Sequence, residues 1–415
     1  MTTDKVKPPH PAIWAILYIP FGALSGFVQV GLTFMATKHG LSITEGALLN
    51  GATLLSQWLK WIWAPVVDIT LTPKIWYVLS TALTALGTIA MAAIPMGPET
   101  LNLLLAVIAI TSLINSIVGM SIESMMAAVT PRDDIGRVSG WFQAGNLGGV
   151  GLGGGLGLLL LDKLPQPWMS GAGLAILFMF CCLPLVLLPP VTAHEAKDGV
   201  LASVQDVGVD LWKMLKTRAG ALSAFLCFLP IGTGAAQVVL AQATVAAKWG
   251  AGATDVERVQ GFAAGMITAV GCFAGGYLCQ LMHPRTQYAT VSLFLAAVAV
   301  GMGLAPATVA MYVVWNFIYA FAVGLAYAGF TAVVLDAMGP GSAATKYNVY
   351  ASLSNFPIWW VGLLLGWVAD KHGAPAMLYT EAALGVVGVI AFFVAIRIFK
   401  PTDGTPGSSG STSSP

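Results

Sequence analysis

The sequence places a few ionisable side chains inside long apolar segments, where they could bind or move a proton. Glu123 lies in the segment INSIVGMSIESMMAAV, about two helical turns from the end of an apolar run. A carboxylate at the centre of a membrane helix costs about 2.5–3.5 kcal/mol on insertion scales. Because burial favours the protonated carboxyl group, Glu123 could gain and lose a proton near neutral pH. We therefore predict that proton binding at Glu123 is coupled to the protein's function, with structural hydrogen bonding between helices as the alternative.

A second group of charges could open and close a path through the protein. Lys60 and Asp68 lie in the stretch Gln57–Asp68 and are eight residues apart, about two turns, so they point to a similar helix face. Asp68 with Lys74 and the loop 130–137 could form paired charges that separate in another state. The alternative is helix capping by Asp68, with Lys60 reaching the membrane interface. The predicted gating residues are Lys60, Asp68, Arg137, Asp336 and Lys346.

Uncharged polar side chains within other apolar segments are predicted to bind a substrate. Each of them, taken alone, could equally join two helices by hydrogen bonds. The predicted substrate-binding residues are Gln29, Asn115, Gln143, Asn146, Gln237, Asn316 and Asn355.

Composition indicates that these side chains are positioned by membrane helices. Of the 415 residues, 57% are hydrophobic and 9% charged, and the mean hydropathy is +0.80. Soluble domains carry about 25% charged residues. The apolar runs exceed the roughly 20 residues that cross a bilayer as a helix, and backbone groups in lipid must be satisfied within their own segment. The net charge of +1 argues against nucleic acid as a partner and leaves the lipid bilayer as the expected surroundings.

Twelve membrane spans are predicted, in two sets of six. A polar stretch at 191–217, with a surface helix expected near Val204–Leu215, separates the sets, and the Gly/Ser-rich tail at 401–415 should be disordered. The predicted domains are 1–190, 191–217, 218–400 and 401–415. The predicted spans are 12–36, 46–69, 74–96, 101–129, 138–161, 168–190, 218–247, 258–282, 287–305, 308–337, 346–369 and 376–398.

The two halves repeat one another in sequence. An offset of 210 residues aligns one series of positions, and an offset of 209 aligns a later one. A parallel six-plus-six repeat is typical of major facilitator transporters, whose substrate site lies between the halves near the midplane. The fold class predicted here is therefore all-α, a major facilitator fold of two pseudo-symmetric six-helix bundles. Matched pairs include Pro20 and Pro230, Gly22 and Gly232, Lys38 and Lys248, Pro131 and Pro340, Arg137 and Lys346, and Asn146 and Asn355.

The placement of lysine and arginine predicts the orientation. With the N-terminus inside, 13 of the 19 basic residues fall in inner segments, five fall in outer ones, and Lys60 lies near a boundary. The positive-inside rule then places both termini in the cytoplasm, in the cell inner membrane. An even number of spans agrees with that placement.

Other classes of function lack their motifs. The sequence shows no Ser-His-Asp set, metal cluster or nucleotide-binding loop, so we expect no enzyme activity, no cofactor, no metal and no ATP-driven transport. The five cysteines form no CxxC pair. The glycine-rich run 148–155 lies in a predicted span with no preceding strand, so it is interpreted as a surface for close helix packing.

Two stretches resemble a particular family. Trp61–Asp68 is similar to the end of helix two in AmpG-like permeases, in the peptide/acetyl-CoA transporter branch of the major facilitators. The stretch 343–354, followed by Gly366–Gly373, is similar to the helix-eleven region of that family. The resemblance implies uptake driven by the proton gradient, with muropeptides, acetyl-CoA or siderophores among the substrates of the branch.

The leading hypothesis is a proton-coupled symporter that takes up an organic solute, muropeptide-like or related, by alternating access. We expect it to act as a monomer. The alternatives are efflux of drugs or metabolites, and a non-transporting membrane receptor with the same fold. Efflux members often carry a Gly- and Arg-rich second inner loop, and the stretch 70–76 is poor in both residues.

Overall fold

The computed structural model describes residues 9–39, 41, 43–191, 200–339 and 342–398. Among these residues, ten helices are long and apolar enough to cross a membrane. They match ten of the twelve predicted spans. The other two are α3 (Ile43–Ile69), which carries Glu45, Lys60 and Asp68, and the predicted span 218–247, which is broken into shorter helices.

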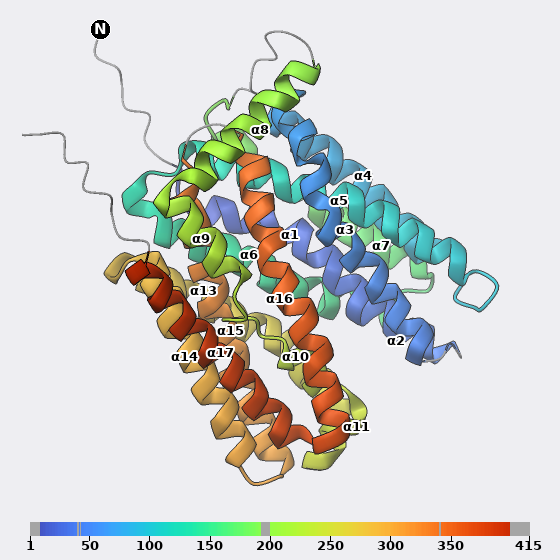
Figure 1. The fold of residues 1–415 in the computed structure, drawn as a ribbon. Helices are drawn as coiled ribbons and strands as arrows, with labels where there is room; N and C mark the ends of the chain where they lie inside the picture. Colours follow the sequence, from blue (N-terminus) through green and yellow to red (C-terminus); the bar gives the residue numbers. More distant parts are fainter. Residues whose placement is uncertain (1–8, 40, 42, 192–199, 340–341, 399–415) are drawn as a thin grey trace, which may run out of the picture.

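The first half of the chain forms six helical segments (Figure 1). The first predicted span consists of α1 (Ala12–Gly26), a π-helical turn η1 (Phe27–Leu32) and α2 (Thr33–Lys38). Several helices begin at proline, whose fixed φ suits the first turn. In α4, for example, Pro73 is the first residue, and the Thr72 side chain before it caps the helix. After α3 come α4 (Pro73–Ala93), α5 (Leu101–Val129), α6 (Ile135–Lys163), α7 (Pro167–Phe180) and η3 (Leu183–Leu187).

The second half begins with a helix that is interrupted in the middle. Its pieces are α9 (Arg218–Phe228), α10 (Ala236–Leu240), α11 (Ala243–Ala246) and η4 (Ala247–Trp249). Pro230 lacks an N–H group, and Gly232 and Gly234 adopt positive φ values of 61° and 62°, which break the helix. The predicted span 218–247 is therefore several short helices and not one continuous helix.

The remaining helices follow the predicted spans with small shifts at their ends. The eighth span contains a second π-helical turn, η5, between two α-helices. The helices are α12 (Ala253–Arg258), η5 (Val259–Ala263), α13 (Ala264–Leu281), α14 (Pro284–Leu304), α15 (Val309–Met338), α16 (Ala343–His372) and α17 (Ala374–Ile398).

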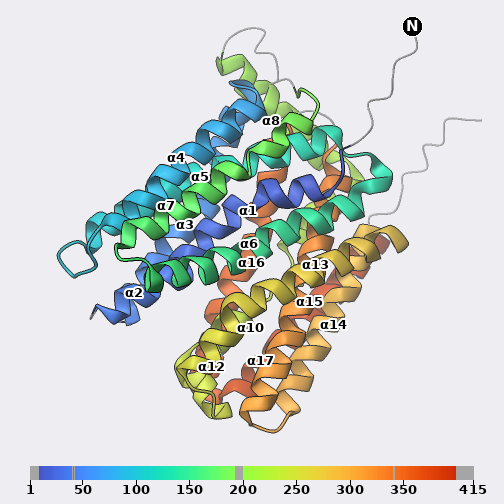
Figure 2. The same ribbon diagram turned by 180° about the vertical axis from the view of Figure 1, so that it is seen from behind.

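A surface helix joins the halves, as predicted. α8 (Val200–Lys216) lies across one end of the bundle and contacts α3, α9 and α16 (Figures 1 and 2). We call this the linker end; the loops after α4 and α14 lie at the opposite end. The predicted disordered tail at 401–415 lies outside the described residues.

The two halves contact each other along α6, which packs on α13 and α15, and at the linker end. α3 and α5 pack against α16, and Ala64, Val67, Met120 and Ala344 form a small buried cluster there. Toward the opposite end α2 and α11 diverge (Figures 1 and 2). There, a Cβ atom added at Gly51 of α3 or at Gly366 of α16 would meet no atom within 4 Å.

The glycine-rich run packs α6 closely against its neighbours, which confirms that prediction. A Cβ atom at Gly153 would lie 1.9 Å from the carbonyl oxygen of Ala23 in α1. On another face of α6, a Cβ atom at Gly151 would lie 3.1 Å from the Cα atom of Gly265. The small residues therefore let two backbones approach α6.

Substitution at Gly153 is expected to destabilise the protein. In Gly153→Val the side chain cannot fit against Ala23, and overpacking of this kind costs about 1–3 kcal/mol or more. Thermal unfolding in detergent measures the effect. The matched control is Gly366→Ala, another helix glycine with open space around it, which should raise or preserve stability. Equal unfolding temperatures for Gly153→Val and Gly366→Ala would contradict the packing account.

The repeat is also visible in a tertiary contact. In the first half the Tyr77 hydroxyl of α4 donates to the carbonyl oxygen of Leu17 in α1, at 2.7 Å. In the second half the Tyr288 hydroxyl of α14 donates to the carbonyl oxygen of Ile231, at 2.9 Å. Each buried tyrosine thus ties the third span of its half to the first.

Candidate functional site

A buried carboxylate joins four helices from both halves. Glu123 in α5 is 1% exposed. Its Oε1 accepts a hydrogen bond from the Tyr18 hydroxyl of α1 at 3.2 Å, and its Oε2 accepts one from the Asn348 side chain of α16 at 2.8 Å. Asn348 also donates to the carbonyl oxygen of Ala344, which fixes its amide on the helix surface. Glu123 therefore links the first half directly to the second.

A buried cation lies beside this carboxylate. The Lys60 ammonium of α3 is 3.9 Å from Glu123 Oε1, and its side chain is 7% exposed. Lys60 therefore does not reach toward the interface, which was one reading of its position in the sequence. A buried pair of this kind stabilises only while both partners are charged, since a single unpaired charge would be costly there. Protonation of Glu123 would thus change the free energy of its interactions with Lys60, Tyr18 and Asn348.

A second carboxylate caps a helix of the opposite half. Asp68 at the end of α3 accepts hydrogen bonds from the backbone N–H groups of Ala344 and Thr345, at 3.1 and 2.9 Å, and from the Thr345 hydroxyl at 2.7 Å. These are the first residues of α16, where unpaired N–H groups and the helix dipole favour a negative charge. Asp68 therefore holds the linker end of α3 against α16.

Side chains from α8 reach the same point. The Ser342 hydroxyl, just before α16, donates to Asp210 of α8 at 3.3 Å. Ser342 has a positive φ of 40°, in the left-handed region. The start of α16 is thus held by one carboxylate from α3 and one from α8.

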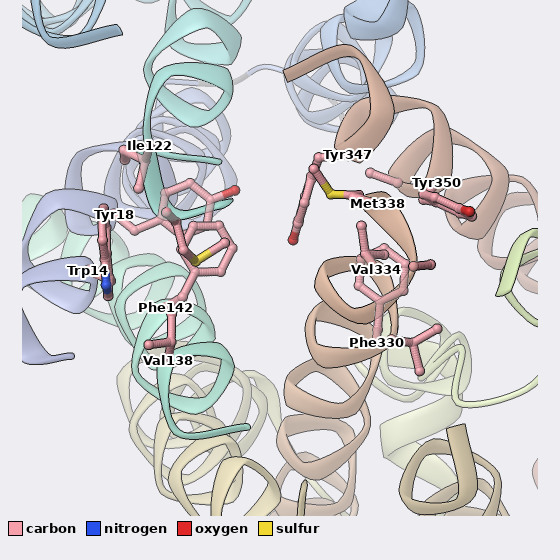
Figure 3. Close-up of a cluster of buried hydrophobic side chains, with 14 of the residues drawn as sticks. Trp14, Tyr18, Ile122, Val138, Phe142, Phe330, Val334, Met338, Tyr347 and Tyr350 are labelled. Carbon is pink, nitrogen blue, oxygen red and sulfur yellow. The ribbon is translucent and has the colours of Figure 1, made fainter. Parts of the chain in front are cut away.

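Buried aromatic and aliphatic side chains from the two halves face each other in one cluster (Figure 3). Tyr18 stacks on Phe142, with ring centroids 4.0 Å apart, on the side of the first half. Tyr347 meets Phe142 edge-on at 6.1 Å and Phe330 edge-on at 6.4 Å. We call these four residues the aromatic layer. Tyr18 of this layer donates to Glu123, which is almost fully buried, and burial strengthens electrostatic interactions.

A chain of amide and hydroxyl groups also crosses between the halves. The Gln143 side chain of α6 donates to the Thr331 hydroxyl of α15 at 2.7 Å, and Asn146 donates to Gln143 at 3.0 Å. The Thr331 and Tyr347 hydroxyl groups are 3.2 Å apart. Two of the predicted substrate residues therefore share one network beside the aromatic layer.

Loss of the Thr331 hydroxyl should weaken this network. Thr331→Val keeps the shape but leaves buried partners without a hydrogen bond, at a cost of about 1–3 kcal/mol. Thermal unfolding gives the measurement. Thr380→Val, which removes only a bond within α17, serves as control and should change stability less. If both variants unfold alike, the network contributes nothing of its own.

The other predicted substrate residues lie in different surroundings. Asn115 donates to the carbonyl oxygen of Phe21 at 3.0 Å, within the first half. Asn316 donates to the carbonyl oxygen of Tyr312 and accepts from Gln260, within the second half. Gln29 is exposed, and Gln237 and Asn355 are half-buried. Residues 352–356 of α16, which include Asn355, are all partly exposed.

The remaining predicted gating residues are found apart from Glu123. Asp336 of α15 pairs with Arg285 at 3.0 Å, and Arg285 also donates to Ser223, so this contact lies within the second half. Arg137 is exposed at the start of α6. Lys346 is buried one residue after the Thr345 that binds Asp68. Lys74, expected near Asp68, donates to the carbonyl oxygen of Leu188 at 2.5 Å.

Several site residues were missed in the sequence, although some left a signal. Thr345 and Asn348 are three residues apart, so they share one face of α16, and this face meets Asp68 and Glu123. Tyr18 and Thr331 gave no signal, because tyrosine and threonine are common in any helix of this kind. Among the described residues, no group of three or more His, Cys, Asp or Glu side chains could hold a metal ion.

The comparison with known families agrees with this architecture. Residues 14–360 match the Major Facilitator Superfamily, which is most of the chain. The chain belongs to this superfamily, whose members are secondary transporters and not enzymes. It is therefore a multi-pass membrane transporter for a small solute. No curated protein sequence gives a significant match to it.

Solved structures share the fold at low sequence identity. A variant of the Escherichia coli fucose:proton symporter FucP aligns with a TM-score of 0.71 and 14% identity, covering 92% of this chain and 98% of that one. FucP in the outward conformation aligns with a TM-score of 0.70 and 15% identity, covering 92% of this chain and 97% of that one. The human organic anion transporter MFSD10 (TETRAN) aligns with a TM-score of 0.61 and 15% identity, covering 92% of this chain and 98% of that one. These likenesses confirm the predicted major facilitator fold.

Proposed function

We propose that this chain is a proton-coupled symporter that takes up an organic solute, with Glu123 as the proton-binding residue. The observation that carries the proposal is the contact of Glu123 with Lys60 and with Asn348 of the other half. An acid that bonds across the moving interface can link its own protonation to the movement. The fold shared with a fucose:proton symporter supports the proposal.

Protonation would act on the linker end in a defined direction. Ionised Glu123 attracts Lys60 and accepts from Asn348, and both interactions hold α3, α5 and α16 together. A protonated carboxyl group attracts Lys60 less and is a weaker acceptor. Proton binding therefore favours separation of the halves at the linker end, and proton release favours their contact.

The linker end is proposed to face the cytoplasm, as the lysine and arginine distribution predicts. The state described above, with contact at the linker end, would then face outward. The likeness to FucP in the outward conformation supports this assignment of state. Both termini, separated from α8 by even numbers of spans, would also be cytoplasmic, in the cell inner membrane.

The solute is proposed to bind between the halves, on the opposite-end side of the aromatic layer. Gln29, Gln237 and Asn355 would meet it there, since all three are at least partly exposed. Gln143 and Asn146, which are joined by a hydrogen bond, would border the same region. Asn115 and Asn316 would act indirectly, by fixing helices within each half. The resemblance to AmpG-like permeases favours a muropeptide-like solute.

A screen followed by a transport assay tests the proposal. Thermal shifts of the purified protein with muropeptides, siderophores, carboxylates and nucleotides should identify a ligand that raises the unfolding temperature. In proteoliposomes, accumulation of that ligand should then require an inward proton gradient. Uptake that is unchanged when the gradient is collapsed would contradict proton coupling, and export-only transport would favour efflux.

A further inference from the structure

A second buried carboxyl group lies in the other half, far along the chain from Glu123. Glu381 of α17 is 6% exposed. Its Oε1 accepts a hydrogen bond from the Tyr319 hydroxyl of α15 at 2.7 Å and one from the backbone N–H of Ala236 at 3.2 Å. Its Oε2 is buried and has no hydrogen-bond partner among the described residues. Oε1 therefore accepts two hydrogen bonds, and Oε2 accepts none from the described residues.

The Ala236 contact places this carboxyl group at the break between α9 and α10. The backbone is not helical over 229–235, so its polar groups need partners outside a helix. Tyr288 supplies one to the carbonyl oxygen of Ile231. Glu381 supplies the partner for the N–H group at the start of α10. It is thus one of the groups that fix the shape of the broken helix.

The neighbouring helices offer this carboxyl group no positive charge. The titratable side chains of α15 near it are tyrosines, Tyr319 above all, and α14 adds Tyr288. α10 has no titratable residue. The charged residues of α16 and α17 lie toward the helix ends, at 346, 370–372 and 397, and α9 adds Arg218 at its start. Among the described residues, no Lys, Arg or His side chain forms an ion pair with Glu381.

These contacts identify the form in which Glu381 is most stable. A buried carboxylate without a cation is far more costly than a single missing hydrogen bond. In the neutral acid the proton is on Oε2, and Oε1 still accepts from Tyr319 and Ala236. The only group left without a hydrogen bond is then the Oε2 hydroxyl of Glu381 itself. We propose that Glu381 is a second proton-binding site, whose proton stabilises the α9–α10 break, so that loss of the proton loosens it. This inference is independent of the role of Glu123.

Infrared spectroscopy tests whether Glu381 carries a proton. The full-length protein in lipid nanodiscs should show the carbonyl stretch of a buried carboxylic acid at neutral pH. This band should persist in Glu123→Gln and in the exposed-residue control Glu99→Gln, and should be absent from Glu381→Gln. Tyr319→Phe, which removes one hydrogen bond from the carbonyl oxygen, should shift the band without abolishing it. A spectrum of Glu381→Gln identical to that of the parent would overturn the proposal.

Hydrogen exchange tests whether the proton stabilises the break. After correction for intrinsic exchange, amides at 229–236 in the parent protein should lose protection on alkaline titration. In Glu381→Gln, a neutral side chain at every pH, their protection should not change with pH. Protection that depends on sodium concentration instead of pH would show that a metal cation occupies the site, and would overturn the proposal. Neither readout uses transport, so each result stands apart from the test of symport.

Discussion

Replacing Glu123 by glutamine should abolish gradient-driven accumulation in proteoliposomes and leave exchange of the solute across the membrane intact. Glutamine keeps the length of the side chain; its one amide oxygen can accept from Asn348 while its NH2 group donates to the Tyr18 hydroxyl oxygen, so the contact between the halves can still form. It cannot bind or release a proton, and it cannot attract Lys60 as an anion. Accumulation should fall to the level reached by equilibration, while counterflow continues.

The control for this experiment is Glu99→Gln, which neutralises an exposed loop carboxylate outside the helices. It should accumulate solute like the parent protein. Lys60→Gln provides a second comparison, because it leaves Glu123 buried without a cation. It should favour the protonated form of the carboxyl group and weaken its response to the gradient. Full coupling in Glu123→Gln would remove this residue from the mechanism.

Replacing Asp68 by alanine should shift the protein toward states in which the linker end is open. The variant loses three hydrogen bonds to the start of α16. Hydrogen bonds to charged groups contribute about 1.5–3 kcal/mol each, although water replaces part of this when the contact opens. We expect the equilibrium between closed and open linker ends to move about 10- to 100-fold, since 1.4 kcal/mol is tenfold.

Accessibility of a cysteine introduced in place of Met120, buried in this contact, would measure the shift. The matched control is Asp336→Ala, which removes a carboxylate whose ion pair lies within one half. It should leave the accessibility at position 120 unchanged. A double-mutant cycle with Thr345→Ala isolates the pairwise energy across the halves. Equal accessibility in Asp68→Ala and the parent would contradict a gating role for Asp68.

Much of the fold follows from the sequence because hydropathy and helix length are local properties. The span at 101–129 is predicted with the observed bounds, and α8 falls on the predicted surface helix. The break after α9 was missed although Pro230, Gly232 and Gly234 lie within a few residues. In a membrane helix such residues are compatible with an unbroken helix, since neighbouring groups can satisfy the backbone. Only the tertiary partners distinguish the two outcomes.

The site was predictable in part, for a physical reason. An acid within an apolar run is unusual enough to identify by itself, so Glu123 was found, and Asp68 was found at the end of its helix. Their partners Asn348 and Thr345 belong to the other half of the chain, 225 and 277 residues away along the sequence. Glu381 lies near the predicted start of the last span, where a carboxylate could reach water, so its position in the sequence does not indicate burial. Its burial comes from α15 and α10.

The central claim is that protonation of Glu123 opens the contact between the halves at the linker end. Distances between spin labels, in a variant without the native cysteines, test it most directly. One label pair at Arg132 and Thr286 spans the linker end, and another at Glu99 and Ala307 spans the opposite end; all four positions are exposed.

On acidification the parent protein should show longer distances for the first pair and shorter ones for the second. Glu123→Gln should show distances that do not respond to pH in this way. Distances in the parent protein that are independent of pH, or a pH response that persists unchanged in Glu123→Gln, would contradict the account.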